Sequence, residues 1–221
     1  MTIAAKICGI STPEALDVAV ACGAAYVGFV HFPASPRHVN FQQMAALSAS
    51  LPASVKSVAV VVDPSDELLA ELIATAKPAY VQLHGTEAPL RLKAIKAAFP
   101  GLGVIKALSV STFADTQRAG AFSGVADMLL FDAKPPKDGK LPGGNGISFD
   151  WSILAGRSFA LPWFLSGGLD TDNVAAALAQ SGAQMVDVSS GVEVAAGVKD
   201  PEKIKHFLST VHSYDASKTY T

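Results

Sequence analysis

The sequence predicts an α/β protein that folds as a single (β/α)8 barrel, the TIM-barrel class, over residues 1–221. Eight short apolar runs follow one another along the chain, and a helix-like stretch comes after each of them. The runs are almost continuously apolar rather than alternating, which indicates strands that are covered on both faces. No linker interrupts the repeat, so a doubly wound open sheet, with fewer strands and one switch point, is the weaker alternative.

The expected elements follow directly from these patterns. The expected strands are Ala5–Ile10, Tyr26–Phe32, Ser57–Val62, Ala79–Leu83, Gly103–Leu108, Met128–Phe131, Trp163–Leu165 and Met185–Val188. The expected helices are Thr12–Ala21, Asn40–Ser50, one opening at Pro64, Ala88–Phe99, Phe113–Phe122, Trp151–Ala155, Asn173–Gln180 and Pro201–His212. Thr12 and Asp200 are expected caps, each followed by proline at the first helical position. In the fourth helix we expect Leu90, Ile95 and Ala98 to form the apolar face. The polar tail after about residue 212 is expected to fray.

Composition narrows the class of protein. Half of the residues are apolar and 16% are charged, enough for a core that needs no disulfide or metal staple. The formal net charge is -2 and there is no basic stripe, so no nucleic-acid partner is expected. Cys8 and Cys22 form no CxxC pair, so neither a disulfide framework nor a zinc site is predicted.

The N-terminal stretch does not resemble a signal peptide, because Lys6 interrupts its apolar run and no long apolar segment follows. No run reaches the ~18 apolar residues of a membrane span. The sequence therefore predicts a cytoplasmic protein without a membrane partner, and nothing in it implies an obligate protein partner.

Cys8 and Asp132 are the first candidates for chemistry. Cys8 ends the first strand just before Gly9, and Asp132 ends the sixth. Ligands bind at this end of the strands in parallel α/β folds. The structural alternatives are a buried core cysteine and, for Asp132, a helix cap or a salt bridge to Lys134.

The two candidates are expected to face each other across the mouth of the barrel. Strand spacing and tilt give a ring about 15 Å across, which leaves roughly 7 Å between two inward side chains. That gap is about the width of one sugar. A thiolate and a carboxylic acid on its two sides form a base and acid pair for proton transfer.

Other polar residues also follow strands. Gln82 and His84 end the fourth strand, although a lone histidine is more often structural. Arg37 follows the second strand and is suited to a bidentate contact with a carboxylate, with a surface arginine as the alternative. Asp63 ends the third strand, and the Pro64 after it favours a capping or loop role.

Two glycine-rich loops predict a phosphate site. Gly167 and Gly168 follow the seventh strand, and Ser190 and Gly191 follow the eighth. In such barrels a phosphate commonly lies between these loops on backbone N–H groups. Neither a GxGxxG nor a GxxxxGK[ST] motif is present, so no dinucleotide or nucleoside triphosphate is implied. The long loop 133–149, rich in proline and glycine, is expected to serve the same rim.

Together these motifs resemble the phosphoribosylanthranilate isomerase family. The matching stretches are KICGI, GFVHFPASPRHV, VAVVVD, VQLHGTE, LLFDA, LPGGNGISFDW, LSGGL, VDVSSGVE and GVKD, from residue 6 to residue 200. Departures are Ser11 and Asn145, where threonine is common, and the variable Pro33-Ala34. None of these positions is the proposed acid or base.

The resemblance implies an Amadori rearrangement in tryptophan synthesis, with an N-aryl ribosylamine 5-phosphate as the phosphorylated substrate. It assigns Cys8 as general base, Asp132 as general acid and Arg37 as the group that holds the anthranilate, while the glycines of the last two loops hold the phosphate. Gln82 and His84 are expected to contact the substrate. No metal or organic cofactor is required. The chemistry calls for a raised pKa at Asp132 and a lowered pKa at Cys8, where Lys6 is a candidate helper.

Two other hypotheses remain open. One is a different sugar-phosphate barrel enzyme, such as an indole-glycerol-phosphate synthase or a histidine-pathway isomerase. A synthase is expected to have a catalytic lysine on an early strand, and only Lys6 precedes Cys8, with no lysine on the second strand. The other is a catalytically silent barrel that senses sugar phosphates, which the Cys8 and Asp132 pair disfavours.

Overall fold

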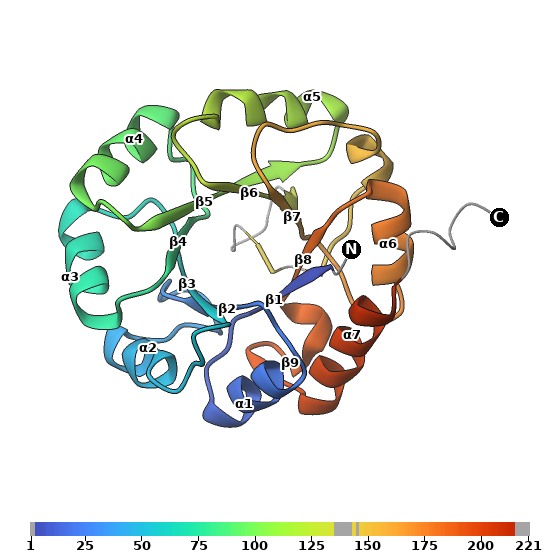
Figure 1. Ribbon diagram of the computed structural model, residues 1–221, viewed down its shortest axis with the longest axis horizontal. Helices are drawn as coiled ribbons and strands as arrows, with labels where there is room; N and C mark the ends of the chain where they lie inside the picture. Colours follow the sequence, from blue (N-terminus) through green and yellow to red (C-terminus); the bar gives the residue numbers. More distant parts are fainter. Residues whose placement is uncertain (1–2, 135–142, 145, 215–221) are drawn as a thin grey trace.

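The computed structural model of the chain describes residues 3–134, 143–144 and 146–214. Eight parallel strands close into a barrel in which each strand pairs with its sequence neighbours and β8 pairs with β1. Figure 1 shows this ring with the helices arranged around its outside. The closed ring confirms the predicted (β/α)8 barrel and excludes the open doubly wound sheet.

The strands lie close to their predicted positions. They are β1 (Ala4–Cys8), β2 (Tyr26–Val30), β3 (Lys56–Val61), β4 (Tyr80–Leu83), β5 (Gly103–Val110), β6 (Met128–Ala133), β7 (Trp163–Leu165) and β8 (Met185–Val188). β1 ends at Cys8, two residues before the predicted end, because Gly9 adopts a φ of +79° and breaks the strand. β6 extends through Asp132, so this carboxylate belongs to the strand itself.

The helices on the outside are less regular than predicted. They are α1 (Pro13–Ala21), α2 (Phe41–Ser48), α3 (Asp66–Ala76), α4 (Pro89–Ala98), α5 (Phe113–Thr116), α6 (Val174–Ser181) and α7 (Pro201–Ser213). The described residues also form three 3-10 turns: η1 (Gln117–Phe122) after α5, η2 (Trp151–Leu154) before β7 and η3 (Ser190–Val192) after β8. The predicted fifth helix is thus a short α-helix that tightens into a 3-10 turn, and the sixth is a 3-10 turn alone. Within the described part of the chain, no helix has the length and apolar character that a membrane crossing requires.

Capping residues set several helix starts. Thr12 accepts a hydrogen bond from Ala15 N at the start of α1, and Asp200 accepts from two backbone N–H groups of α7, as predicted. The third helix was predicted to open at Pro64. It begins at Asp66 instead, because Ser65 is its N-cap. The Ser65 side chain accepts a hydrogen bond from Leu68 N. The tail from residue 215 lies outside the described residues.

The predicted apolar face of α4 was right for Ile95 and wrong for Leu90 and Ala98. Leu90 is 78% exposed and Ala98 is also exposed, whereas Leu92 and Ile95 are buried against the barrel. Residues three apart lie on the same side of a helix, and residues two apart lie on nearly opposite sides. Leu90 therefore points away from the face that Leu92 and Ile95 share.

The core has two layers. The larger layer lies between the strands and the outer helices, and the smaller fills the inside of the barrel. The inner layer contains Cys8, Val58, Val60, Ile105, Ala107, Met128, Leu130 and Phe164. Cys8 is therefore directed into the barrel, and alternate residues of the same strands face the helices.

An antiparallel pair of short strands lies between β8 and α7, where the sequence analysis named no strand. β9 (Glu193–Ala195) pairs with β10 (Val198–Lys199). Gly197 has a φ of +82° in the turn, and a Cβ there would collide with the backbone of Pro36. The hairpin is thus packed against the loop that carries Arg37.

Candidate active site

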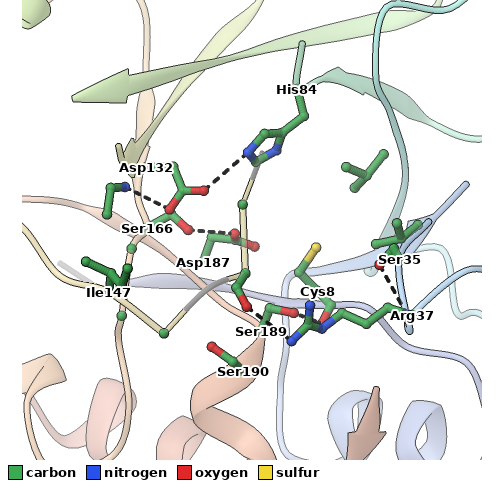
Figure 2. A pocket seen from close by; sticks show the side chains of 18 of the residues that line it. Cys8, Ser35, Arg37, His84, Asp132, Ile147, Ser166, Asp187, Ser189 and Ser190 are labelled. Atoms are coloured by element: carbon green, nitrogen blue, oxygen red, sulfur yellow. Dashed lines mark hydrogen bonds and ion pairs between the residues drawn. The ribbon is translucent and has the colours of Figure 1, made fainter. Parts of the chain in front are cut away.

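A pocket opens at the C-terminal ends of the barrel strands (Figure 2). Its lining includes eight of the nine predicted site residues: Cys8, Arg37, Gln82, His84, Asp132, Gly167, Gly168 and Ser190. The ninth, Gly191, is not among these lining residues, and its lack of a side chain lets the loop after β8 pack closely on the backbone of Leu169. The structure brings nearly all predicted residues to one site.

Cys8 sits at the floor of the pocket and is 6% exposed. Its strand partner in β2 is Gly28, and the absence of a side chain there leaves room for the thiol. A Cβ at Gly28 would lie 2.9 Å from Cys8 Sγ. The position of the thiol thus depends on a glycine in the neighbouring strand.

A buried ion pair lies next to Cys8 in the barrel. Lys6 is fully buried, and its Nζ donates a 2.8 Å hydrogen bond to Asp187 Oδ1. Ser166 Oγ donates to the other carboxylate oxygen of Asp187 at 3.0 Å. Since Lys6 is already paired and has no exposed surface, it is poorly placed to serve as the free catalytic lysine of a synthase.

Burial raises the pKa of the Cys8 thiol above its ordinary value. The ammonium groups of Lys6 and Lys199 act in the opposite direction, and the Asp187 carboxylate reinforces the rise. The expected lowering was therefore wrong, because desolvation outweighs the two cations. A raised pKa makes the thiolate a stronger base, but it leaves a smaller fraction of Cys8 in the thiolate form at neutral pH.

Asp132 is 5% exposed and is held by two hydrogen-bond donors. Its Oδ1 accepts from Ala133 N at 2.9 Å, and its Oδ2 lies 3.2 Å from His84 Nε2. Gln82 Nε2 lies 2.8 Å from His84 Nδ1. With the amide N–H donating to Nδ1, the ring carries its proton on Nε2 and donates it to Asp132. The partner of Asp132 is thus His84 rather than Lys134.

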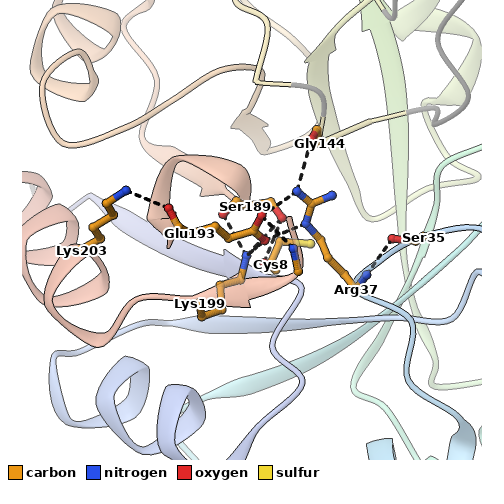
Figure 3. A network of polar contacts seen from close by, with 9 residues as sticks. Cys8, Ser35, Arg37, Gly144, Ser189, Glu193, Lys199 and Lys203 are labelled. Carbon is orange, nitrogen blue, oxygen red and sulfur yellow. Dashed lines mark hydrogen bonds and ion pairs between the residues drawn. The ribbon is translucent and has the colours of Figure 1, made fainter. Parts of the chain in front are cut away.

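Arg37 lies on the other side of the pocket within a network of polar contacts (Figure 3). Its Nε and Nη2 donate to the two oxygens of Glu193 at 2.7 and 2.8 Å. Nη2 also donates to the carbonyl oxygen of Gly144 at 3.3 Å. Lys199 Nζ lies 2.7 Å from Glu193 Oε1, and it also donates to Ser189 O at 2.8 Å. Arg37 is therefore a buried, paired residue and not a surface arginine.

The pKa values within this network reflect opposed effects. Burial would raise the pKa of Glu193, but hydrogen bonds from Arg37 and Lys199 bring it below its ordinary value. Burial lowers the pKa of Lys199, and the nearby Glu193 opposes this change. The carboxylate form of Glu193 is therefore favoured.

The glycine-rich loops lie at the rim of the pocket beside residues 146–148. A Cβ on Gly168 would lie 2.7 Å from Ser148 N, and one on Gly167 would lie 2.7 Å from Ala133 N. Both glycines have positive φ angles, +90° for Gly167 and +64° for Gly168. These close approaches need glycine, because a side chain at either position would collide with the neighbouring backbone. In the long loop, Pro135, Pro136, Gly139, Pro142 and Asn145 lie outside the described residues.

Comparison with known proteins identifies the family. A sequence profile of the family N-(5'phosphoribosyl)anthranilate (PRA) isomerase matches residues 5–210. The chain belongs to this family. An N-(5'-phosphoribosyl)anthranilate isomerase of Caulobacter sp. (strain K31) is 55% identical over 210 residues, 95% of this chain and 98% of the relative.

Solved structures of PRA isomerases share the fold. The phosphoribosyl anthranilate isomerase of Thermotoga maritima has a TM-score of 0.85 at 35% identity, over 95% of this chain and 98% of the other. Another phosphoribosyl anthranilate isomerase was solved in complex with reduced 1-(o-carboxyphenylamino)-1-deoxyribulose 5-phosphate. It has a TM-score of 0.80 at 32% identity, with the same coverage of both chains.

Several polar residues at this PRA isomerase site escaped the sequence analysis. Asp187 interrupts the apolar strand Met185–Val188, and a carboxylate in a strand covered on both faces was a signal for it. Glu193 and Lys199 lie in the matching stretches VDVSSGVE and GVKD, but nothing in the sequence indicated that they pair, because the hairpin that brings them together was not predicted. Asp63 accepts hydrogen bonds from the backbone and hydroxyl of Thr86, which confirms its predicted loop role.

Proposed function

We propose that the chain isomerises N-(5'-phosphoribosyl)anthranilate to 1-(2-carboxyphenylamino)-1-deoxyribulose 5-phosphate, the Amadori step of tryptophan biosynthesis, with Cys8 as base and Asp132 as acid. Family membership supports the reaction. The observation that carries the roles is the placement of Cys8 and Asp132 in one pocket, on β1 and β6, three strands apart around the ring.

The first step is opening of the ribose ring. Asp132 in its protonated form gives a proton to the furanose oxygen as the bond from C1′ to that oxygen breaks, and the anilino nitrogen supplies the electron pair. The product is an iminium ion, and Asp132 becomes a carboxylate. The hydrogen bonds from His84 Nε2 and Ala133 N stabilise that carboxylate.

The second step is proton removal from carbon. The iminium group acidifies the proton on C2′, and the Cys8 thiolate removes it to give an enolamine. The proton carried by Cys8 can then be delivered to C1′, while the C2′ hydroxyl becomes a ketone and gives its proton back to Asp132. Atoms and charges balance, and these steps require no metal or organic cofactor.

The two ends of the substrate have separate binding groups in this proposal. The anthranilate carboxylate is held by Arg37, whose Nη1 is not engaged by Glu193. The 5-phosphate is held by backbone N–H groups of Gly167, Gly168 and Gly191 with the Ser190 hydroxyl. Gln82 acts through His84, and His84 acts on Asp132.

The test measures loss of phosphoribosylanthranilate, generated in situ, with wild type, Cys8→Ala and Asp132→Asn. Each substitution is expected to lower kcat by about 10²–10⁴, the size of a general acid or base contribution. Cys22→Ala is the matched control, because Cys22 is a half-buried thiol at the end of α1 and lies outside the pocket lining. Near-normal turnover in either site variant would remove that residue from the mechanism. A folded wild type without turnover would refute the proposed reaction.

A further inference from the structure

The guanidinium of Arg37 is already occupied along one edge. Glu193 takes its Nε and Nη2 in a bidentate contact, and both side chains are buried, 6% and 4% exposed. The second hydrogen of Nη2 donates to the carbonyl oxygen of Gly144, so Nη1 is the group left for a ligand in the pocket that Arg37 lines. Among the described residues Nη1 has no hydrogen-bond partner.

An arginine and a buried glutamate that form an ion pair have together no net charge. A neutral pair of this kind attracts a carboxylate less strongly than a free arginine does. Lys199 changes this balance, because its Nζ lies 2.7 Å from Glu193 Oε1 and its side chain is 2% exposed. With two cations and one anion, the cluster of Arg37, Glu193 and Lys199 has a net charge of +1.

The β9–β10 hairpin supplies both additional residues. Gly197 N in its turn donates to Glu193 Oε2 at 3.2 Å, and Lys199 Nζ donates to Ser189 O at the end of β8. The hairpin is thus joined to the barrel rim by partly buried hydrogen bonds and to Arg37 by buried ones (Figure 3). The glutamate and the lysine are held rigidly, as a site that orients another side chain requires.

We propose that Glu193 and Lys199 are positioning residues that give the site its preference for a substrate carboxylate. Glu193 fixes the plane and direction of the Arg37 guanidinium, so that its free Nη1 faces the pocket. Lys199 balances the charge of Glu193, so that the cluster keeps one positive charge for the incoming carboxylate. This inference rests on the proposed function, in which Arg37 binds the anthranilate carboxylate.

The test compares the binding of two ligands that differ only in the carboxylate. One is reduced 1-(o-carboxyphenylamino)-1-deoxyribulose 5-phosphate, and the other is the same compound made from aniline, which lacks the carboxylate. Calorimetry gives Kd for each, and their ratio measures the carboxylate preference. For the wild type we expect a ratio of about 10–100, the value of a charge-assisted hydrogen bond.

Three variants separate positioning from general damage. Lys199→Met removes the balancing charge, and we expect the ratio to fall to about 3 or less while binding of the aniline ligand is unchanged. Glu193→Gln raises the local charge to +2 but places an amide N–H against the guanidinium, so the ratio falls as well. Lys203→Met is the matched control, because Lys203 is an exposed lysine whose ammonium donates to the backbone oxygen of Glu193 and, among the described residues, to no charged group of the cluster. It should keep the wild-type ratio.

The outcomes are distinct. Tighter carboxylate binding by Glu193→Gln would show that charge alone matters and would overturn the positioning role. An unchanged ratio in Lys199→Met, or an equal loss for both ligands, would overturn the role of Lys199. If Glu193→Gln does not fold, Lys199→Met still decides. A wild type that turns over phosphoribosylanthranilate yet binds both ligands equally refutes this inference alone. A wild type that binds neither ligand and shows no turnover refutes the proposed function.

Discussion

Gly28→Ala is the substitution that most directly tests whether the position of Cys8 matters. Gly28 pairs with Cys8 between β1 and β2 and is buried. The new Cβ would lie 2.9 Å from Cys8 Sγ, 3.1 Å from Lys6 Cε and 3.2 Å from Cys8 Cα. Ordinary contacts begin near 3.4 Å, so the thiol must move by about 0.5 Å or rotate away.

The expected effects on stability and activity are different in size. Overpacking costs about 1–3 kcal/mol of folding stability. Alanine also lowers the conformational entropy of the unfolded chain, which stabilises the folded protein by about 0.4–1 kcal/mol. A net loss of about 1–2 kcal/mol lowers the melting temperature by roughly 2–8 °C in a chain of this length. Misplacement of a reacting group by about 1 Å can lower the rate about 10²-fold. We therefore expect kcat to fall by about 10–100-fold in a variant that remains folded.

The assay is turnover of phosphoribosylanthranilate at 25 °C, with thermal unfolding recorded on the same samples. Gly120→Ala is the control, because a Cβ at Gly120 meets nothing within 4 Å and this glycine has no positive φ. It should keep full activity. A folded Gly28→Ala protein with more than half of the wild-type kcat would refute the claim that the thiol needs this space.

Three further outcomes are expected. Lys106→Met should lower the free energy of unfolding in urea by about 3–5 kcal/mol, because Glu87, 2.6 Å from Lys106 Nζ, would remain as an unpaired buried charge. His84→Ala should lower kcat by about 10-fold or more, since the Asp132 carboxylate loses a donor. Hydrogen bonds from Ser111 hold the pKa of Asp115 at about 2. The Asp115 carboxylate therefore stabilises the fold fully above about pH 4, and this contribution is lost as the pH falls to 2. Asp115→Asn should therefore melt about 2–4 °C lower at pH 7 and no lower than wild type near pH 2.

Each of these predictions has its own contrary result. For the buried pair, Lys205→Met is the control, because the Lys205–Glu202 pair is 59% and 69% exposed and should change stability by less than about 0.5 kcal/mol. An equal loss in both lysine variants would contradict the argument from burial. Unchanged turnover in His84→Ala would leave the histidine as a structural residue. A melting difference for Asp115→Asn that persists at pH 2 would show that ionisation is not its cause.

Strand positions were the most reliable prediction because both faces of each strand are covered. A strand buried on two sides must be continuously apolar, and that pattern is visible without knowledge of its neighbours. The ends were less reliable. β1 stops at Cys8 because Gly9 takes a left-handed conformation, and Ile10 is buried although it lies outside the strand.

Helix faces were less predictable than strands. The apolar residues of α4 are few, and whether Leu90 or Leu92 faces the barrel depends on where the helix begins. Pro89 sets that start, and one residue of shift rotates the face by about 100°. The 3-10 turns at Gln117–Phe122 and Trp151–Leu154 depend on packing, which sequence patterns do not report.

The sequence alone determined the barrel, the end of the barrel that carries the site and most of the residues that line the pocket. It could do so because consecutive parallel strands bring their C-terminal ends to one rim, whatever the loops between them. Only the tertiary structure decided how these residues are charged and paired. The raised pKa of Cys8 comes from burial, which Asp187 reinforces and Lys6 opposes, and the pairing of Arg37 with Glu193 joins residues 156 positions apart. Such contacts depend on distances across the fold, and neither composition nor local spacing contains them.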